Sequence, residues 1–186
     1  MKTKYVLLWA IVLFAIDQTI KIVIDRYFLD VRFDIISPLF YFKPTFNHQY
    51  SWINGLFGLG MGFWAHIVIF CVIAVLVAFF YDWMKSISGN NKMLNIAFVF
   101  CFAGMISSLI GTIFWNGCLD YIYLKPLFVF DLKDLFIDTF IILLLLYLHK
   151  NNKHLSSIKN KDLICHFKNR FSSIINQKSK MENGTQ

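Results

Sequence analysis

The stretches Cys118-Leu119-Asp120-Tyr121-Ile122 and Phe130-Asp131-Leu132-Lys133-Asp134 decide how this chain is organised. They place two carboxylates, Asp120 and Asp134, just outside apolar runs suited to a membrane. A carboxylate near hydrocarbon is costly, so it needs a partner, a water-filled cavity or a catalytic role. Two carboxyl groups held close together share one proton, which leaves a base and an acid side by side.

The composition predicts an integral membrane protein. Of the 186 residues, 58% are hydrophobic, and the mean hydropathy of +0.58 is too high for an ordinary soluble domain. The chain contains 21 Phe, 8 Tyr and 5 Trp, which suit a lipid environment. We expect a single membrane domain over residues 1–148, because no linker separates two hydrophobic blocks and no internal repeat is visible.

Four apolar segments are predicted as spans, at residues 5–24, 63–81, 93–113 and 132–148, and the apolar run of the last one is short for a full bilayer. The first carries Asp17 and Lys21, four residues apart and therefore on one helical face. This pair, and the lack of a small-residue cleavage site, argue against a cleaved signal peptide. The pair either makes insertion tolerable or has a functional role. We expect the last helix to begin near Asp131, which can cap it.

The segment between the first two spans, residues 25–62, is predicted to be an outer β segment. Residues 29–35 alternate apolar and polar side chains, which is strand periodicity. Residues 39–42 could return as a second strand that Lys43-Pro44 ends. The predicted fold class is an all-α membrane protein of four transmembrane helices with a small periplasmic β segment.

The charge of +7 is concentrated in the tail, residues 149–186, where eight basic residues begin at Lys150. Such a flank is typical of the cytoplasmic side of a membrane, and Lys85 and Lys92 mark the loop at 82–92 as cytoplasmic. Both termini are therefore predicted to be cytoplasmic, with the tail on the inner leaflet or disordered. No nucleic-acid module is visible. The cysteines and histidines show no paired spacing, so neither a disulfide framework nor a metal site is predicted.

Four motifs occur in the order found in one family. Asp17-Gln18-Thr19-Ile20-Lys21 matches an Asp-Gln-x-x-Lys motif, and Asn47 with Ser51-Trp52 resembles Asn-x-Gly-x-x-aromatic, with Gln49 at the glycine position. Leu119-Asp120-Tyr121-Ile122 resembles Val-Asp-Phe-Ile, and residues 129–134 resemble Val-Phe-Asn-x-Ala-Asp. Across residues 5–148 the chain resembles the lipoprotein signal peptidases (signal peptidase II).

The resemblance implies a membrane aspartic endopeptidase of the bacterial cytoplasmic (inner) membrane. One of Asp120 and Asp134 would take a proton from water, and the other would donate to the carbonyl oxygen or the leaving amine. The substrate would be the signal peptide of a diacylglyceryl-modified prolipoprotein, with membrane lipids around it. No cofactor is implied, and we expect a monomer. Further substrate-binding or supporting residues would be Asp17, Lys21, Asn47, Asn116 and Asp131.

The sequence also departs from the family. The family's Gly-Asn-x-x-Asp-Arg motif falls on residues 107–112, which read Ser-Ser-Leu-Ile-Gly-Thr, and Asn116 could supply the missing amide. Asp131 and Lys133 replace an Asn and an Ala, and Lys133 would favour an ionised pair unless it turns to solvent or headgroups. The alternative is an inactive homologue that binds lipoprotein signal helices or assists a membrane partner. A small transporter is less favoured than either of these interpretations, because the four spans show no inverted repeat.

A third carboxylate, Asp138, lies one turn after Asp134 in the expected last helix. Its position nearer the bilayer centre would be costly without a partner, and Lys21 could serve.

Overall fold

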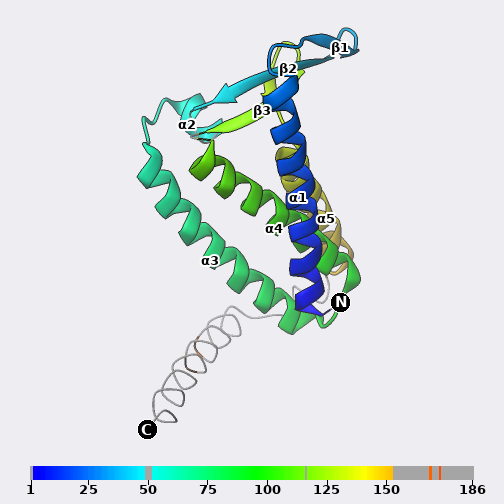
Figure 1. The fold of residues 1–186 in the computed structure, drawn as a ribbon. Coiled ribbons are helices and arrows are strands. Elements are labelled where there is room, and N and C mark those ends of the chain that lie inside the picture. The colour runs from blue at the N-terminus through cyan, green and yellow to red at the C-terminus, as the bar shows by residue number, and fades with distance from the viewer. Residues whose placement is uncertain (1, 49–51, 116, 153–167, 169–171, 173–186) are drawn as a thin grey trace.

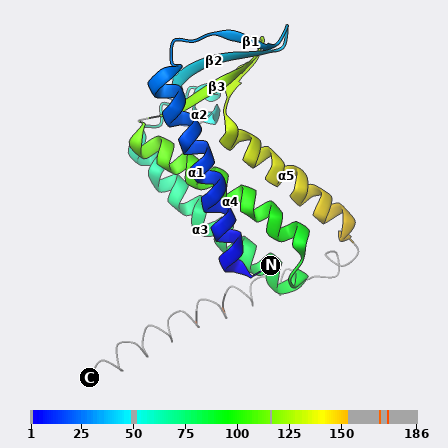
Figure 2. The same ribbon diagram turned by 45° about the vertical axis from the view of Figure 1, so that its right-hand side comes forward.

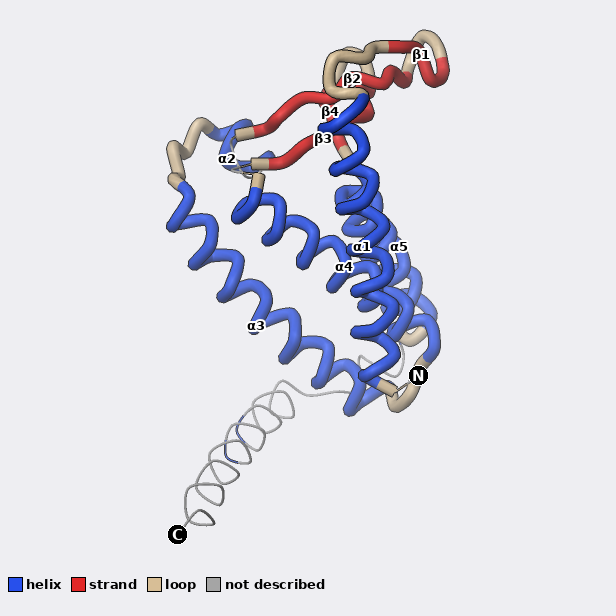
Figure 3. The backbone as a smooth tube through the Cα atoms, viewed as in Figure 1, coloured by secondary structure: helices blue, strands red, loops and turns tan. Residues whose placement is uncertain are grey.

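The computed structural model describes residues 2–48, 52–115, 117–152, 168 and 172. Over these residues, long helices form a bundle and short strands form one sheet at its end (Figures 1 and 3). The elements in chain order are α1 (Thr3–Tyr27), β1 (Phe33–Ile36), β2 (Phe40–Asn47), α2 (Trp52–Phe57), α3 (Phe63–Ser88), α4 (Lys92–Phe114), β3 (Cys118–Leu124), β4 (Phe128–Phe130) and α5 (Leu132–Lys150).

The central helix of the bundle is α4, which packs along both α1 and α5 and touches α3 less (Figure 2). Helix α3 diverges from α1 toward the sheet (Figure 1). Helices α1, α3 and α4 are long and apolar enough to cross a membrane. These three confirm three of the four predicted spans as apolar helices. The predicted span at 132–148 is also helical. Its first turns carry charged side chains, and its crossing of the membrane stays a prediction.

The end of the bundle away from the sheet is closed by aromatic packing. Phe98 is fully buried and contacts Tyr81, Phe102 and Phe140. The Tyr81 hydroxyl donates to Asn95 Oδ1 at 2.8 Å, so a buried polar group is paired within this core.

The predicted loop at 82–92 is shorter than expected, because α3 continues to Ser88. Gly89 then stops the helix with φ of +61°, and Asn91 caps α4 by accepting from Leu94 N at 3.2 Å.

The sheet is antiparallel throughout, in the order β1-β2-β3-β4. The predicted hairpin is present, but its first strand covers Phe33–Ile36 rather than residues 29–35. The expectation that Lys43-Pro44 ends its second strand is also wrong. β2 continues to Asn47, and the register shifts between Phe42 and Thr45. Pro44 lies inside this irregularity, where its missing N–H breaks no ladder hydrogen bond.

Two further strands, β3 and β4, were not expected from the sequence. Residues Cys118–Tyr121 are all buried, so β3 shows no alternation of apolar and polar side chains. Leu119 and Tyr121 pack with Ile24 of α1. The predicted outer β segment at 25–62 therefore supplies only half of the sheet, and the stretch that carries Asp120 supplies the rest.

Gly117, between α4 and β3, is held where only glycine fits. Its φ is +152°, and a Cβ there would collide with the main-chain carbonyl of Asn47. We expect Gly117→Ala to lower the free energy of unfolding by about 1–3 kcal/mol, because the backbone must shift. Thermal unfolding in detergent micelles measures the loss. Gly62→Ala is the matched control, since nothing lies within 4 Å of its Cβ position. Equal melting temperatures for the two variants would contradict the prediction.

Candidate active site

A network of charged side chains lies where the sheet meets the helices. Its members come from α1, β3 and the start of α5, segments that are distant in sequence. They are Asp17, Lys21, Asp120, Asp131, Lys133 and Asp134. The structure thus brings together five of the seven site residues predicted from the sequence, and adds Lys133.

On the α1 side, Lys21 is buried between two carboxylates. Its Nζ lies 3.0 Å from Asp17 Oδ2 and 2.7 Å from Asp131 Oδ2, and the three side chains are at most 1% exposed. The predicted pairing of Asp17 with Lys21 is confirmed. The suggestion that Lys21 pairs with Asp138 is wrong, because the ion pairs of Lys21 reach Asp17 and the helix start at Asp131 instead.

The first turn of α5 is organised by a capping box. Asp131 Oδ1 accepts from Asp134 N at 3.3 Å, and Asp134 Oδ2 accepts from Asp131 N at 3.1 Å. This confirms that the helix begins near Asp131, which caps it. Burial alone would raise the pKa of Asp131, but the charges of Lys133 and Lys21 outweigh it and lower that pKa below its ordinary value.

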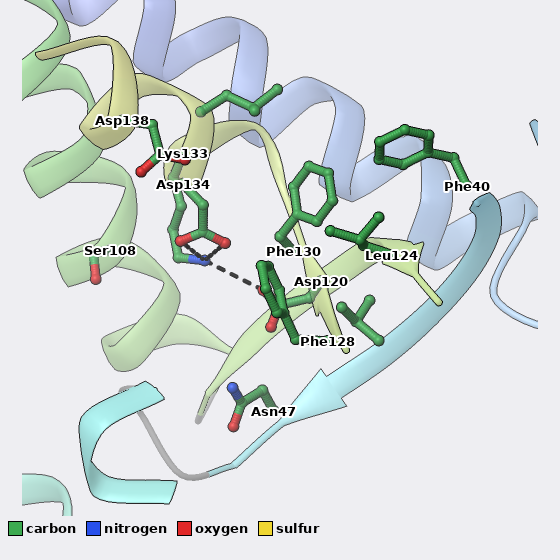
Figure 4. A pocket seen from close by; sticks show the side chains of 12 residues that line it. Phe40, Asn47, Ser108, Asp120, Leu124, Phe128, Phe130, Lys133, Asp134 and Asp138 are labelled. Carbon is green, nitrogen blue, oxygen red and sulfur yellow. Dashed lines mark hydrogen bonds and ion pairs between the residues drawn. The ribbon is translucent and has the colours of Figure 1, made fainter. Parts of the chain in front are cut away.

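Lys133 turns into the network. Its Nζ lies 3.2 Å from Asp120 Oδ1 and 3.3 Å from Asp134 Oδ1 (Figure 4). The same Nζ lies 2.9 Å from Asp131 Oδ1. Side chains on a helix point toward its N-terminus, which carries this one back over the cap. The alternative that Lys133 faces solvent or headgroups is therefore wrong, since the residue is only 9% exposed.

Asp120 lies on β3, opposite Thr45 of β2, and is 6% exposed. Burial raises the pKa of Asp120, and the positive charge of Lys133 offsets part of that rise. The sheet therefore fixes this carboxylate at a site partly withdrawn from water, where it holds a proton more tightly than an exposed aspartate does.

Asp120 and Asp134 line the same cavity, whose volume is about 640 Å³ (Figure 4). Most of its wall is apolar, with aromatic and aliphatic side chains from β2, β3, β4 and α5. These are Phe40, Leu124, Phe128, Val129, Phe130 and Leu135. The carboxylates thus open into an apolar cavity of the size that binds small ligands or a short chain segment.

The comparison with known families identifies this architecture. The family described as signal peptidase (SPase) II matches residues 9–150, a range that includes every charged side chain of the network. The chain belongs to the signal peptidase II family. Membership supports a lipoprotein signal peptidase-like function, within the hydrolases and proteases.

Two solved structures of bacterial membrane enzymes, determined by the in meso method, share the fold. The one at 2.3 Å resolution has a TM-score of 0.63 and 18% identity, covering 86% of this chain and 96% of its own. The one at 1.9 Å has a TM-score of 0.63 and 17% identity, covering 80% and 94%. No curated protein sequence matches the chain.

The remaining site residues take different places in this signal peptidase II family member. Asn47 ends β2 and lines the cavity, and Asp138 lines it from α5. Asn116 lies outside the described residues. In the segment at 107–112, Ser107 is fully buried and Ser108 faces the cavity, so this turn of α4 brings no charge to the site. The aromatic cavity wall was not predicted, although Phe128 and Phe130 flank the motif.

Cys118, Asp120 and Asp131 place possible metal-ligating atoms within 4.8 Å of one another. Their chemistry does not favour a cation. Burial raises the pKa of the Cys118 thiol to about 11, despite the opposing charge of Lys133, so the thiol stays protonated at neutral pH. Lys133 Nζ already contacts both carboxylates. An ammonium in this position competes with a metal ion for the same oxygens.

Proposed function

We propose that this protein is a membrane aspartic endopeptidase that removes signal peptides from diacylglyceryl-modified prolipoproteins. The observation that carries the proposal is the convergence of Asp120 and Asp134 on one apolar cavity from two separate elements. Carboxylates in such a place need a role, and family membership supports proteolysis.

The cavity suits a substrate that is partly lipid. Phe40, Phe128 and Phe130 offer apolar surface to an acyl chain or to an apolar signal helix, while the carboxylates lie beside them. Asn47 can donate or accept hydrogen bonds to a substrate backbone. We therefore place the scissile peptide bond at the carboxylates and the lipid against the aromatic wall.

The chemistry needs no covalent intermediate. One of Asp120 and Asp134 accepts a proton from water, and the resulting hydroxide attacks the scissile carbonyl carbon. The carboxyl group then returns the proton to the leaving nitrogen as the C–N bond breaks. The other aspartate orients the water.

The arrangement of the helix ends supports a four-span topology, and we assign the protein to the inner membrane of a bacterium. The start of α1, the turn between α3 and α4 and the end of α5 gather at the pole away from the sheet (Figure 2). At this pole Lys85 Nζ donates a hydrogen bond to Thr3 Oγ1, and the Tyr147 hydroxyl donates one to Ser88 Oγ. We assign this pole, with both termini, to the cytoplasm and the sheet to the periplasm.

In this topology α5 is the fourth span. Its 19 residues extend about 28 Å, close to the hydrocarbon thickness. Lys133 and Asp134 then lie at the outer boundary. The tail at 149–186 falls mostly outside the described residues, and its placement on the inner leaflet stays a prediction, as does the monomeric state.

The direct test is cleavage of a lipid-modified prolipoprotein by the purified protein in lipid nanodiscs, with Asp120→Asn as the matched control. Shortening by the wild type alone would establish the peptidase. If the folded wild type binds the substrate without cleaving it, the protein is a signal-helix-binding homologue.

Asp138 offers a further check on which carboxylates do the chemistry. It lines the cavity one turn beyond Asp134, but Lys133 makes its ion pairs with Asp120, Asp131 and Asp134. We expect Asp138→Asn to lower kcat/KM by less than about tenfold, below the range for loss of a general acid or base. Steady-state kinetics measures it. A loss as large as that of Asp134→Asn would reopen the choice of catalytic pair.

A further inference from the structure

The Lys133 ammonium has its hydrogen-bonding capacity matched to three carboxylates. An ammonium carries three N–H donors and no acceptor. Its three close contacts are the oxygens of Asp131, Asp120 and Asp134, at 2.9, 3.2 and 3.3 Å. A carboxyl group whose contacting oxygen carried the proton would turn a donor toward another donor here. The three contacts therefore favour the ionised form of these carboxylates, against the burial that raises the pKa of Asp120.

The charged groups around Lys133 come from α1, β3 and the start of α5, and they are negative on balance. From α5 come Asp131 and Asp134, and from β3 come Asp120 and the protonated Cys118 thiol. From α1, Lys21 contacts Asp131 Oδ2 and is also paired with Asp17. Within the described residues this network sets two ammonium groups against four carboxylates. Lys133 is the one in contact with both proposed catalytic aspartates.

We propose that the Lys133 ammonium takes the place of the shared proton of the aspartate pair and donates the hydrogen bond that stabilises the carbonyl oxygen during cleavage. This inference rests on the proposed peptidase function and specifies its electrophile. It gives Lys133 a catalytic role, because the ammonium contacts a reacting atom.

The contacts of Lys133 suit such a role. The shortest, to Asp131, is to a residue outside the catalytic pair and holds the ammonium in place. Those to Asp120 and Asp134 are longer and can yield to a substrate oxygen. Lys133 also lines the cavity, where low polarity strengthens a charged hydrogen bond.

In the resulting sequence, an aspartate takes a proton from water while the hydroxide oxygen bonds to the carbonyl carbon. The π electron pair moves to the carbonyl oxygen, which accepts from Lys133. When that pair re-forms the C=O bond, the C–N bond breaks and the aspartate returns its proton to the nitrogen. Lys133 stays protonated throughout, and each aspartate ends as it began.

The first test reads ionisation without needing activity. Infrared spectra of protein labelled with ¹³C-aspartate would be recorded at neutral pH, and the Asp120→Asn and Asp134→Asn spectra would be subtracted to assign the bands. We expect no protonated carboxyl band from Asp120 or Asp134 in the wild type. Lys133→Met should produce one, and Lys133→Arg should not. A protonated band from either aspartate in the wild type would overturn the proposal.

The second test is kinetic. Lys133→Met should lower kcat by about 10²–10³-fold, the usual cost of losing an oxyanion donor, with KM little changed. The acidic limb of its pH profile should move to higher pH, because burial raises the pKa of Asp120 and Lys133 no longer opposes it. Lys133→Arg should recover part of kcat. Unchanged or increased activity in Lys133→Met would overturn the electrophile role.

The two tests separate the proposals. If the wild type cleaves nothing, the peptidase function fails together with the electrophile role. The infrared bands then still decide whether Lys133 replaces the shared proton. The wild-type spectrum also needs no lysine variant to fold.

Discussion

Asp120→Asn should abolish cleavage of a lipid-modified prolipoprotein, a loss in kcat/KM of about 10⁴-fold or more. An amide cannot accept the proton of the attacking water, so the base is lost while the shape of the side chain is kept. Asp134→Asn should behave in the same way, since both carboxylates line the cavity and contact Lys133. Measuring single-turnover cleavage would separate loss of chemistry from loss of substrate binding.

Folding should survive the substitution of Asp120. The network holds more carboxylates than ammonium groups, so removing one negative charge relieves repulsion, and the amide oxygen can still accept from Lys133. We expect the free energy of unfolding to change by less than about 1 kcal/mol, within the range of a single hydrogen bond. Near-normal turnover in either variant, with the fold intact, would remove the aspartate pair from the mechanism.

Lys21→Met should cause the largest loss of stability, about 3–5 kcal/mol. The substitution keeps the length of the side chain but leaves Asp17 and Asp131 buried without the cation between them, and each is 0% exposed. Because Asp131 also caps α5, the start of that helix should loosen with it. Thermal unfolding in micelles, read through intrinsic fluorescence, would measure the effect.

The matched control is Lys4→Met, at an exposed position near the start of α1. It should change the free energy of unfolding by less than about 0.5 kcal/mol. Adding Asp17→Asn to Lys21→Met should recover part of the loss, since one uncompensated carboxylate is then removed. Equal melting temperatures for the Lys21 and Lys4 variants would mean that the buried ion pairs contribute nothing to stability.

Features set by neighbouring residues could be predicted from the sequence. Hydrophobic runs predicted the long helices, the four-residue spacing predicted the pairing of Asp17 with Lys21, and an acidic residue before an apolar run predicted the cap at Asp131. Each of these depends on contacts within a few residues, which a linear pattern records.

Features that depend on contacts between distant segments could not be predicted from the sequence. The strand β3 is buried over Cys118–Tyr121, so it lacks the alternation that marks a strand. The pairing of Lys21 with Asp131 joins the first and last long helices. The direction of Lys133 depends on Asp120, a residue of another element. Only the folded arrangement decides such contacts, although the unusual Asp131 and Lys133 together already indicated an altered charge balance.

The ion pair between Lys21 of α1 and Asp131 at the start of α5 also has a consequence for biosynthesis. The ribosome delivers Asp17 and Lys21 to the bilayer long before Asp131, so for most of synthesis these two charges have only each other. Their spacing lets the first helix enter the membrane as a self-neutralised segment. Arrival of the last helix then divides Lys21 between two carboxylates and brings Asp134 and Lys133 to Asp120. Under the proposed function, a nascent chain therefore acquires its catalytic pair only when α5 has joined the bundle.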